Sequence, residues 1–161
     1  MSHMTEAKRV VEILAAQGAT IAFAESCTGG LLTKLITDVP GASAVLKGGV
    51  CAYANEVKHG VLGVPQRELD TYGAVSRPVA LYMARGVRAL MGTDIGVGTT
   101  GIAGPASDDT KKPVGLVYVA VALPGGRYVV RELHLKGNRD EIREETARQA
   151  LALVLDCAAH L

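Results

Sequence analysis

The spacing of apolar residues along the chain predicts alternating helices and strands. Apolar positions at helical intervals indicate long helices, and short continuous apolar runs indicate strands. The expected helices cover residues 5–17, 76–90 and 138–157 and a stretch from residue 31 that Pro40 and Gly41 terminate, with shorter helical stretches at 55–59 and 65–73. The expected strands cover residues 20–24, 50–54, 95–99, 116–123 and 128–135, the last two joined by a Pro-Gly-Gly hairpin turn. This order predicts an α/β fold, a three-layer α/β/α sandwich around a mixed, mainly parallel sheet of five or six strands.

Polar residues at the expected helix ends predict how these helices begin. Thr5 and Ser76 are suitable N-caps for the helices at 5–17 and 76–90. Asn138 followed three residues later by Glu141 forms a variant of the capping box. Each of these side chains is expected to accept a hydrogen bond from a backbone N–H group that the first helical turn leaves unpaired.

Length and charge limit the class of protein. The 161 residues suit one domain, which we place at residues 5–161 because residues 1–4 resemble an expression-vector scar. The 17 basic and 16 acidic residues give a net charge of +1, which argues against binding nucleic acid by phosphate neutralisation. No apolar run approaches the ~18 residues of a membrane span, and the N-terminus lacks the layout of a signal peptide. We therefore expect neither a nucleic-acid nor a membrane partner.

The chain has three cysteines, Cys27, Cys51 and Cys157. Their odd number and the lack of a CxxC spacing indicate neither a disulfide framework nor a tetrahedral zinc site. We therefore expect a cytoplasmic protein without a metal site.

Three turns that follow expected strands carry polar residues among small ones. They cover residues 24–30, 53–58 and 99–105. In open α/β sheets, ligands bind beyond the carboxyl ends of the parallel strands. If the three strands are parallel neighbours, these turns converge on one cleft.

Ser26 is a candidate nucleophile in the first of these turns. The N–H groups of the helix that follows can hold an oxyanion, and Gly29 and Gly30 allow a substrate to approach the backbone closely. The alternative is that Ser26 or Thr28 only caps this helix, a far more common role. Cys27 is a rival nucleophile, but a cysteine hydrolase needs a histidine base nearby, and a buried structural cysteine is the better interpretation.

Lys58 is the candidate base for a serine nucleophile. A lysine can accept a proton near neutral pH if burial lowers its pKa. Tyr53 precedes it in the same strand-turn unit and can orient it or relay a proton. The alternative is that Lys58 is a solvated surface lysine, as most lysines are.

Residues 96–101 spell GxGxxG after an expected strand, yet they do not indicate a dinucleotide site. No helix opens at the third glycine, and no acidic residue lies near position 121. Thr100 and Gly101 remain able to present hydroxyl and amide donors to a ligand.

Arg139, in the first turn of the last helix, suits a phosphate monoester, although a surface ion pair is an equally good interpretation.

Five blocks in this order resemble the CinA C-terminal domain family, the competence/damage-inducible group that includes nicotinamide mononucleotide (NMN) deamidase. The similarity runs from about residue 5 to residue 157. The blocks are 24–30 (Ala-Glu-Ser-Cys-Thr-Gly-Gly), 50–55 with Lys58, 73–76 (Gly-Ala-Val-Ser), 100–105 (Thr-Gly-Ile-Ala-Gly-Pro) and 112–115 (Lys-Pro-Val-Gly).

The resemblance implies that the chain hydrolyses the carboxamide of NMN to nicotinate mononucleotide and ammonia, in NAD salvage and without a metal or another cofactor. It implies Ser26 as nucleophile, Lys58 as base and Tyr53 close to both. The remaining pocket residues carried over from the family are Glu25, Thr28, Asn55, Thr100, Gly101 and Arg139. It further implies a homo-oligomer, a dimer or larger, and a stand-alone form without the additional N-terminal domain that many relatives carry.

One segment departs from the family pattern. Relatives often show a double glycine shortly after the Gly-Pro pair, where this chain has Ala-Ser-Asp-Asp-Thr at 106–110. Because fold alone does not establish activity, a non-catalytic mononucleotide-binding module linked to competence or DNA-damage response is the alternative to an amidohydrolase.

Overall fold

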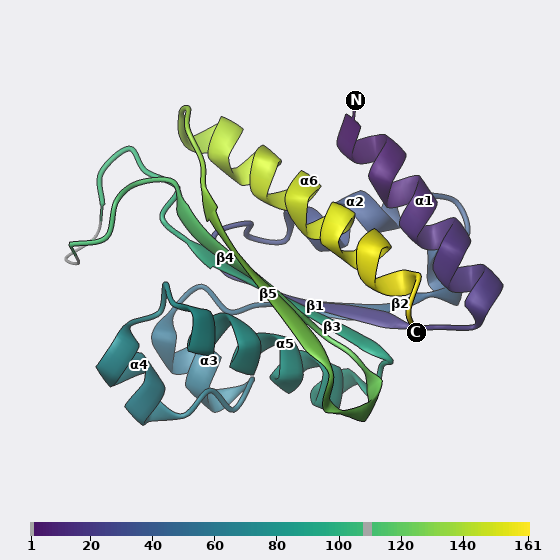
Figure 1. Cartoon of the computed structure of the whole chain (residues 1–161), viewed down its shortest axis with the longest axis horizontal. Helices are drawn as coiled ribbons and strands as arrows, with labels where there is room; N and C mark the ends of the chain where they lie inside the picture. The colour runs from purple at the N-terminus through teal and green to yellow at the C-terminus, as the bar shows by residue number, and fades with distance from the viewer. Residues whose placement is uncertain (1, 108–110) are drawn as a thin grey trace.

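The computed structural model describes residues 2–107 and 111–161, and it has a five-stranded sheet between two layers of helices (Figure 1). The strands are β1 (Ile21–Glu25), β2 (Leu46–Cys51), β3 (Ile95–Gly101), β4 (Leu116–Ala122) and β5 (Tyr128–His134). The α-helices are α1 (Ser2–Gln17), α2 (Leu31–Thr37), α3 (Asn55–Gly60), α4 (Gln66–Tyr72), α5 (Arg77–Met91) and α6 (Arg139–Ala158). Two 3₁₀ turns, η1 (Ala42–Ala44) and η2 (Pro124–Gly126), complete the elements. The predicted α/β sandwich with a mixed sheet is therefore confirmed.

The strand order is β2-β1-β3-β4-β5. Strands β2, β1 and β3 are parallel, and β4 pairs antiparallel both with β3 and with β5. The antiparallel β4–β5 pair is the one that the Pro-Gly-Gly hairpin predicts. Neighbouring parallel strands end at the same edge of the sheet, so the turns after β1, β2 and β3 lie together.

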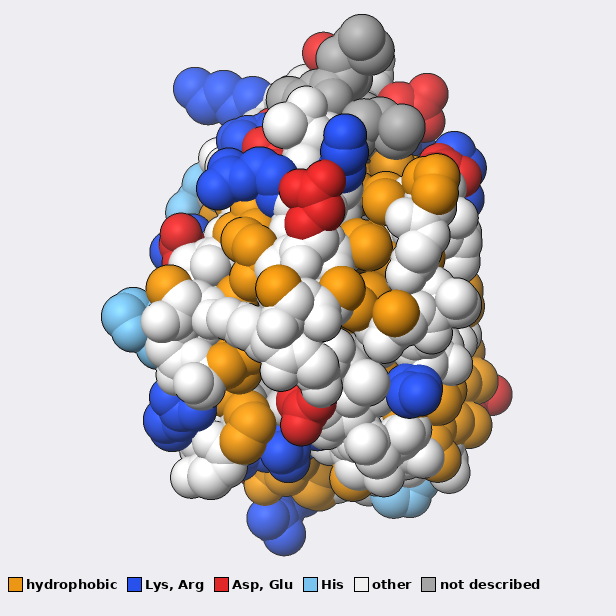
Figure 2. Space-filling model, turned by 90° about the vertical axis from the view of Figure 1, so that its right-hand side faces the viewer, with side chains coloured by type: hydrophobic (Ala, Val, Ile, Leu, Met, Phe, Trp, Pro, Cys, Tyr) orange, Lys and Arg blue, Asp and Glu red, His pale blue; other side chains and the backbone are white. Residues whose placement is uncertain are grey.

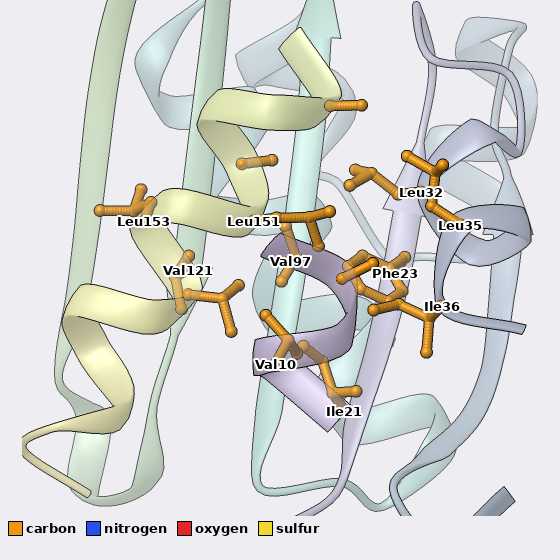
Figure 3. Packing of buried hydrophobic residues seen from close by; sticks show 14 of the residues in the cluster. Val10, Ile21, Phe23, Leu32, Leu35, Ile36, Val97, Val121, Leu151 and Leu153 are labelled. Carbon is orange, nitrogen blue, oxygen red and sulfur yellow. The ribbon is translucent and has the colours of Figure 1, made fainter. Parts of the chain in front are cut away.

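Helices α1, α2 and α6 cover one face of the sheet (Figure 1). Alternate residues of β1, Ile21 and Phe23, point into this layer, where Phe23 lies fully buried close to Ile36 in Figure 3. Leu151 of α6 packs in the same cluster as Val97 of β3. This larger core fixes α6 against the sheet, and the beginning of α6 lies beside the carboxyl edge.

Helices α3, α4 and α5 cover the other face, and α5 lies unusually close to β3. A Cβ atom at Gly96 would lie 2.2 Å from the carbonyl oxygen of Ala84, and one at Gly98 would lie 2.5 Å from that of Ala80. The first two glycines of the GxGxxG sequence therefore let the helix backbone approach the strand. This gives the first two glycines of the sequence a packing role.

The start of one helix, the capping of two others and one strand differ from expectation. Helix α1 begins at Ser2, so Thr5 lies inside the helix and is not its N-cap. Ser76 occupies the N-cap position of α5, but its hydroxyl donates to the carbonyl of Gly73 instead of capping the helix. Helix α2 begins after Gly30, which has a left-handed backbone conformation and no side chain to cap the helix. The capping side chain is that of Glu25 at the end of β1. Strand β2 covers 46–51 and not 50–54, because its pairing with β1 includes glycines that a search for apolar runs omits.

The start of α6 agrees with expectation. The Asn138 side chain accepts a hydrogen bond from the Glu141 amide, and the Glu141 carboxylate accepts one from the Asn138 amide. The capping box is confirmed, and it fixes the position of the first turn of α6, which contains Arg139.

On the side of the molecule shown in Figure 2, apolar side chains form small groups between basic and acidic ones.

In the described part of the chain, no helix combines the length and the apolar composition needed to cross a membrane. The described residues also contain no cluster of three or more His, Cys, Asp or Glu side chains arranged to hold a metal ion. Of the divergent 106–110 segment, residues 108–110 lie outside the described residues.

Candidate active site

A cavity of about 380 Å³ lies beyond the carboxyl ends of β1, β2 and β3. All three polar turns identified in the sequence contribute to its lining, so their predicted convergence is confirmed. The lining residues are Ser26, Cys27, Tyr53, Asn55, Lys58, Gly73, Ala74, Val75, Thr100, Gly101, Ala103 and Arg139. This set contains an arginine, a lysine and no carboxylate, so the described lining suits an anionic ligand.

Ser26 and Lys58 are in direct contact in this cavity. Lys58 Nζ lies 3.0 Å from Ser26 Oγ, 2.8 Å from the carbonyl oxygen of Ala52 and 3.2 Å from that of Tyr53. Only 1% of Lys58 is exposed, so it is not a solvated surface lysine. The two carbonyls can each accept one N–H, and the third position around the nitrogen faces the serine hydroxyl.

Burial lowers the pKa of Lys58 from its usual 10.5 to about 8. The charged form loses solvation in the interior, and the described lining holds no carboxylate that would restore it. A substantial fraction of Lys58 is therefore a neutral amine near pH 8. Neutral Lys58 can donate to the two carbonyls while its lone pair points at Ser26 Oγ.

The turn that carries Ser26 is held from two sides. The Ser26 amide donates to the carbonyl of Thr99 at 3.1 Å, and the hydroxyls of Thr28 and Thr99 lie 2.8 Å apart. From α6, Arg143 donates through Nε to the carbonyl of Cys27 and through a terminal nitrogen to that of Thr28, both at 3.0 Å. These contacts fix the backbone on both sides of Ser26.

Sequence reasoning missed Arg143. The available signal was its position four residues after Arg139, which places both side chains on one face of the helix. Without knowing that this face points to the turn after β1, the spacing alone does not distinguish Arg143 from a surface arginine.

Tyr53 and Arg139 lie together at the cavity. The Arg139 guanidinium donates to the Tyr53 hydroxyl at 3.3 Å and to the carbonyl of Gly104 at 2.6 Å. The Tyr53 side chain is 66% exposed, and its contact with Lys58 is made by its backbone carbonyl. The structure thus brings Tyr53 near the pair through its backbone, while its hydroxyl lies with Arg139.

Glu25 does not line the cavity, contrary to the expectation from the resemblance. Its carboxylate accepts hydrogen bonds from the amides of Leu32 and Thr33 at 2.9 and 3.0 Å, and from the Thr33 hydroxyl at 2.7 Å. It therefore caps α2, the role that the sequence assigned to Ser26 or Thr28. The side chain of a strand residue alternates away from that of its neighbour, which turns Glu25 toward α2.

Three other expected pocket residues lie outside the lining. Thr28 is buried against Thr99, and Gly29 and Gly30 form the left-handed turn that leads into α2. The Gly29 amide donates to the carbonyl of Ser26 at 3.1 Å. The amides of Thr28 and Gly30 have no acceptor among the described residues. They remain available as donors to a ligand.

The last three expected residues do line the cavity. Asn55 is the exposed first residue of α3. Thr100 is buried, and its hydroxyl donates to the carbonyl of Ala74 at 2.9 Å, so it can only accept a hydrogen bond from a ligand. Gly101 is partly exposed at the end of β3, where a Cβ atom would lie 2.5 Å from Val117.

Cys27 is the other nucleophilic side chain in the lining. Burial raises the pKa of its thiol to about 12, so the reactive thiolate is not formed near neutral pH. The lining also contains no histidine in the described part of the chain. Cys27 therefore fits the structural role that the sequence favoured for it.

The sequence matches the CinA C-terminal domain family over residues 3–158. The chain belongs to this family. A CinA-like protein of Anaeromyxobacter sp. strain Fw109-5 is 53% identical over 145 residues, which make up 90% of this chain and 35% of that protein. A CinA-like protein of Thermosynechococcus vestitus is 48% identical over 147 residues, again 90% of this chain and 35% of the relative.

Solved structures of the family agree with the fold. The competence/damage inducible protein CihA from Agrobacterium tumefaciens has a TM-score of 0.94 and 38% identity, covering 97% of this chain and 95% of its own. A CinA superfamily protein from Klebsiella pneumoniae has a TM-score of 0.95 and 29% identity, covering 100% and 99%. The chain spans about a third of the length of the sequence relatives named above, but nearly the whole length of these solved CinA proteins.

Proposed function

We propose that this CinA domain is an amidohydrolase that converts NMN to nicotinate mononucleotide and ammonia. The observation that carries the proposal is the 3.0 Å contact between Ser26 Oγ and a buried Lys58 whose pKa is lowered to about 8. A serine nucleophile needs an adjacent group that accepts its proton, and a neutral lysine meets this need.

The reaction begins with proton transfer from Ser26 Oγ to the neutral amine of Lys58 as Oγ attacks the carboxamide carbon. The carbonyl electrons move onto oxygen and form a tetrahedral intermediate. Lys58, now protonated, gives the proton to the amide nitrogen, the C–N bond breaks and ammonia leaves. Water then attacks the Ser26 ester while Lys58 accepts its proton, and Ser26 departs with that proton as the free hydroxyl.

The oxyanion of the intermediate needs hydrogen-bond donors that are not already used. The Gly29 amide is bound to the carbonyl of Ser26 and is a poor candidate. The amides of Thr28 and Gly30 have no acceptor among the described residues and lie in the same turn as the nucleophile. We assign the oxyanion to these two amides.

The cationic lining supports a phosphorylated substrate. Arg139 lies at the cavity and donates two hydrogen bonds, one to the Tyr53 hydroxyl and one to the carbonyl of Gly104, and a phosphate oxygen can replace either acceptor. At the other side, the positive pyridinium ring of NMN would lie near Lys58 and disfavour its ammonium form. The substrate itself therefore promotes the neutral amine that the first step requires.

An ammonia assay with NMN, nicotinamide, NAD and glutamine tests the proposal. NMN should release ammonia faster than the other three compounds, because it alone pairs a free carboxamide with a mononucleotide phosphate. Calorimetric binding of NMN without ammonia at high enzyme concentration would instead favour a non-catalytic binding module.

A further inference from the structure

The Lys-Pro-Val-Gly block at 112–115 has no part in the proposed chemistry, but the structure gives its lysine a specific contact. Lys112 Nζ donates to the carbonyl oxygens of Tyr72 and of Val75, the latter at 2.6 Å. The residues between these two carbonyls, with Val75 itself, line the cavity. Lys112 therefore joins the loop after β3 to the opposite wall of the candidate active site.

The wall segment at 73–75 lies between α4 and α5 and belongs to neither helix. Two side chains besides Lys112 hold its carbonyls, because Ser76 donates to Gly73 at 2.8 Å and Thr100 donates to Ala74 at 2.9 Å. Each carbonyl of the wall is thus bound by a side chain from outside the segment. The ammonium of Lys112 also lies at the C-terminal end of α4, where a positive charge is favourable.

The backbone that carries Lys112 is itself fixed to the sheet. The Gly115 amide donates to the carbonyl of Ile102 at 2.7 Å, and the Leu135 amide donates to the carbonyl of Gly115 at 2.8 Å. A Cβ atom at Gly115 would lie 1.9 Å from the carbonyl oxygen of Leu135, so only glycine allows this approach. The segment that follows Lys112 is therefore anchored beside the sheet at Gly115, three residues from the lysine that contacts the wall.

We propose that Lys112 is a positioning residue that holds the 73–75 wall against the cavity and so sets the affinity for the mononucleotide. The ammonium does not line the cavity and takes no part in proton transfer. The identity of the ligand in this proposal rests on the proposed function, whereas the effect of Lys112 on the wall does not.

Lys112→Met removes the contacts with the carbonyls of Tyr72 and Val75. Lys111→Met is the matched control because it removes the charge of the neighbouring exposed lysine. For Lys112→Met we expect the KM for NMN and the Kd for nicotinate mononucleotide to rise about tenfold, with kcat within about twofold of wild type. Hydrogen exchange at the 73–75 amides should become faster. Lys111→Met should match wild type in all three measurements.

Lys112→Arg keeps a cation able to donate to both carbonyls and should recover most of the affinity. The proposal is overturned if Lys112→Met keeps the wild-type KM, Kd and exchange, or if Lys112→Arg is no better than Lys112→Met. A fall in kcat and in thermal stability without a selective rise in KM would also overturn it, because that pattern indicates a general structural role. If wild type releases no ammonia from NMN, the proposed function fails, and the exchange comparison still decides whether Lys112 holds the wall.

Discussion

At the scale of single residues, Lys58 determines how the proposed activity depends on pH. Its pKa of about 8 lies below the usual 10.5, and only the neutral form can accept the Ser26 proton. We expect kcat/KM for NMN to rise with pH and to level off above about 8. We expect kcat to rise at a lower pH, because the bound pyridinium further disfavours the ammonium. Initial rates of ammonia release at low and saturating NMN measure the two profiles.

The reverse order of the two midpoints would contradict a pyridinium bound beside Lys58. A rate that falls as pH rises through 8 would contradict the role of Lys58 as a base.

Lys58 also makes a prediction about stability. Because its pKa is lower in the folded chain than in the unfolded one, the unfolded state holds more protons between pH 8 and 10.5. The free energy of unfolding of wild type should therefore rise over this range relative to that of Lys58→Met, which cannot titrate. Urea unfolding of both proteins at pH 7, 8, 9 and 10 measures the difference. If the unfolding free energy of wild type minus that of Lys58→Met stays constant or falls as pH rises, burial does not lower this pKa.

At the scale of elements, the unit formed by β1, the following turn and α2 depends on Glu25. Its carboxylate is 1% exposed and accepts three hydrogen bonds at the start of α2. Glu25→Ala leaves two helix amides without an acceptor and should lower the free energy of unfolding by about 2 kcal/mol. Glu56→Ala, which removes an exposed carboxylate from the first turn of α3, should change it little. Equal losses in the two variants would contradict the capping role.

The elements show where sequence patterns suffice and where they do not. The capping box at Asn138 was predictable because both partners lie three residues apart, and its geometry is entirely local. The Glu25 cap was not predictable, since it spans seven or eight residues across a turn whose shape depends on left-handed glycines. Arg143 and Lys112 were missed as positioning contacts for the same reason, because their carbonyl partners lie 116 and 37 residues away.

The expected candidate site was predictable in part. Ser26, Lys58, Thr100 and Gly101 line one cavity because each lies at or soon after the carboxyl end of one of three neighbouring parallel strands, and this arrangement follows from the alternating pattern. Glu25 was misplaced because a motif does not reveal which side of a strand each of its residues faces.

At the scale of the whole molecule, the packing of one helical layer depends on how closely α5 approaches the sheet. A Cβ atom at Gly98 would lie 2.5 Å from a helix carbonyl oxygen, so Gly98→Ala forces the helix away and should lower the free energy of unfolding by about 3 kcal/mol. Gly60→Ala is the control, since a Cβ atom there has no atom within 4 Å and alanine suits a helix. Thermal or urea unfolding compares them. An undisturbed Gly98→Ala variant would contradict the close approach of helix and strand.

The two helical layers contribute different parts of the site. Lys58 comes from α3 in one layer, whereas Arg139 and Arg143 come from α6 in the other, and the sheet edge between them carries Ser26. The proposed base and the proposed phosphate-binding group therefore reach the cavity from opposite faces of the sheet. This division explains why no continuous stretch of sequence contains the whole site.

The most direct measurement for the proposed nucleophile compares Ser26→Ala with wild type at pH 8 in an ammonia assay with NMN and in NMN calorimetry. The account predicts that Ser26→Ala binds NMN with nearly wild-type affinity and releases ammonia at least about a thousandfold more slowly. Release of ammonia by Ser26→Ala at the wild-type rate would contradict the account.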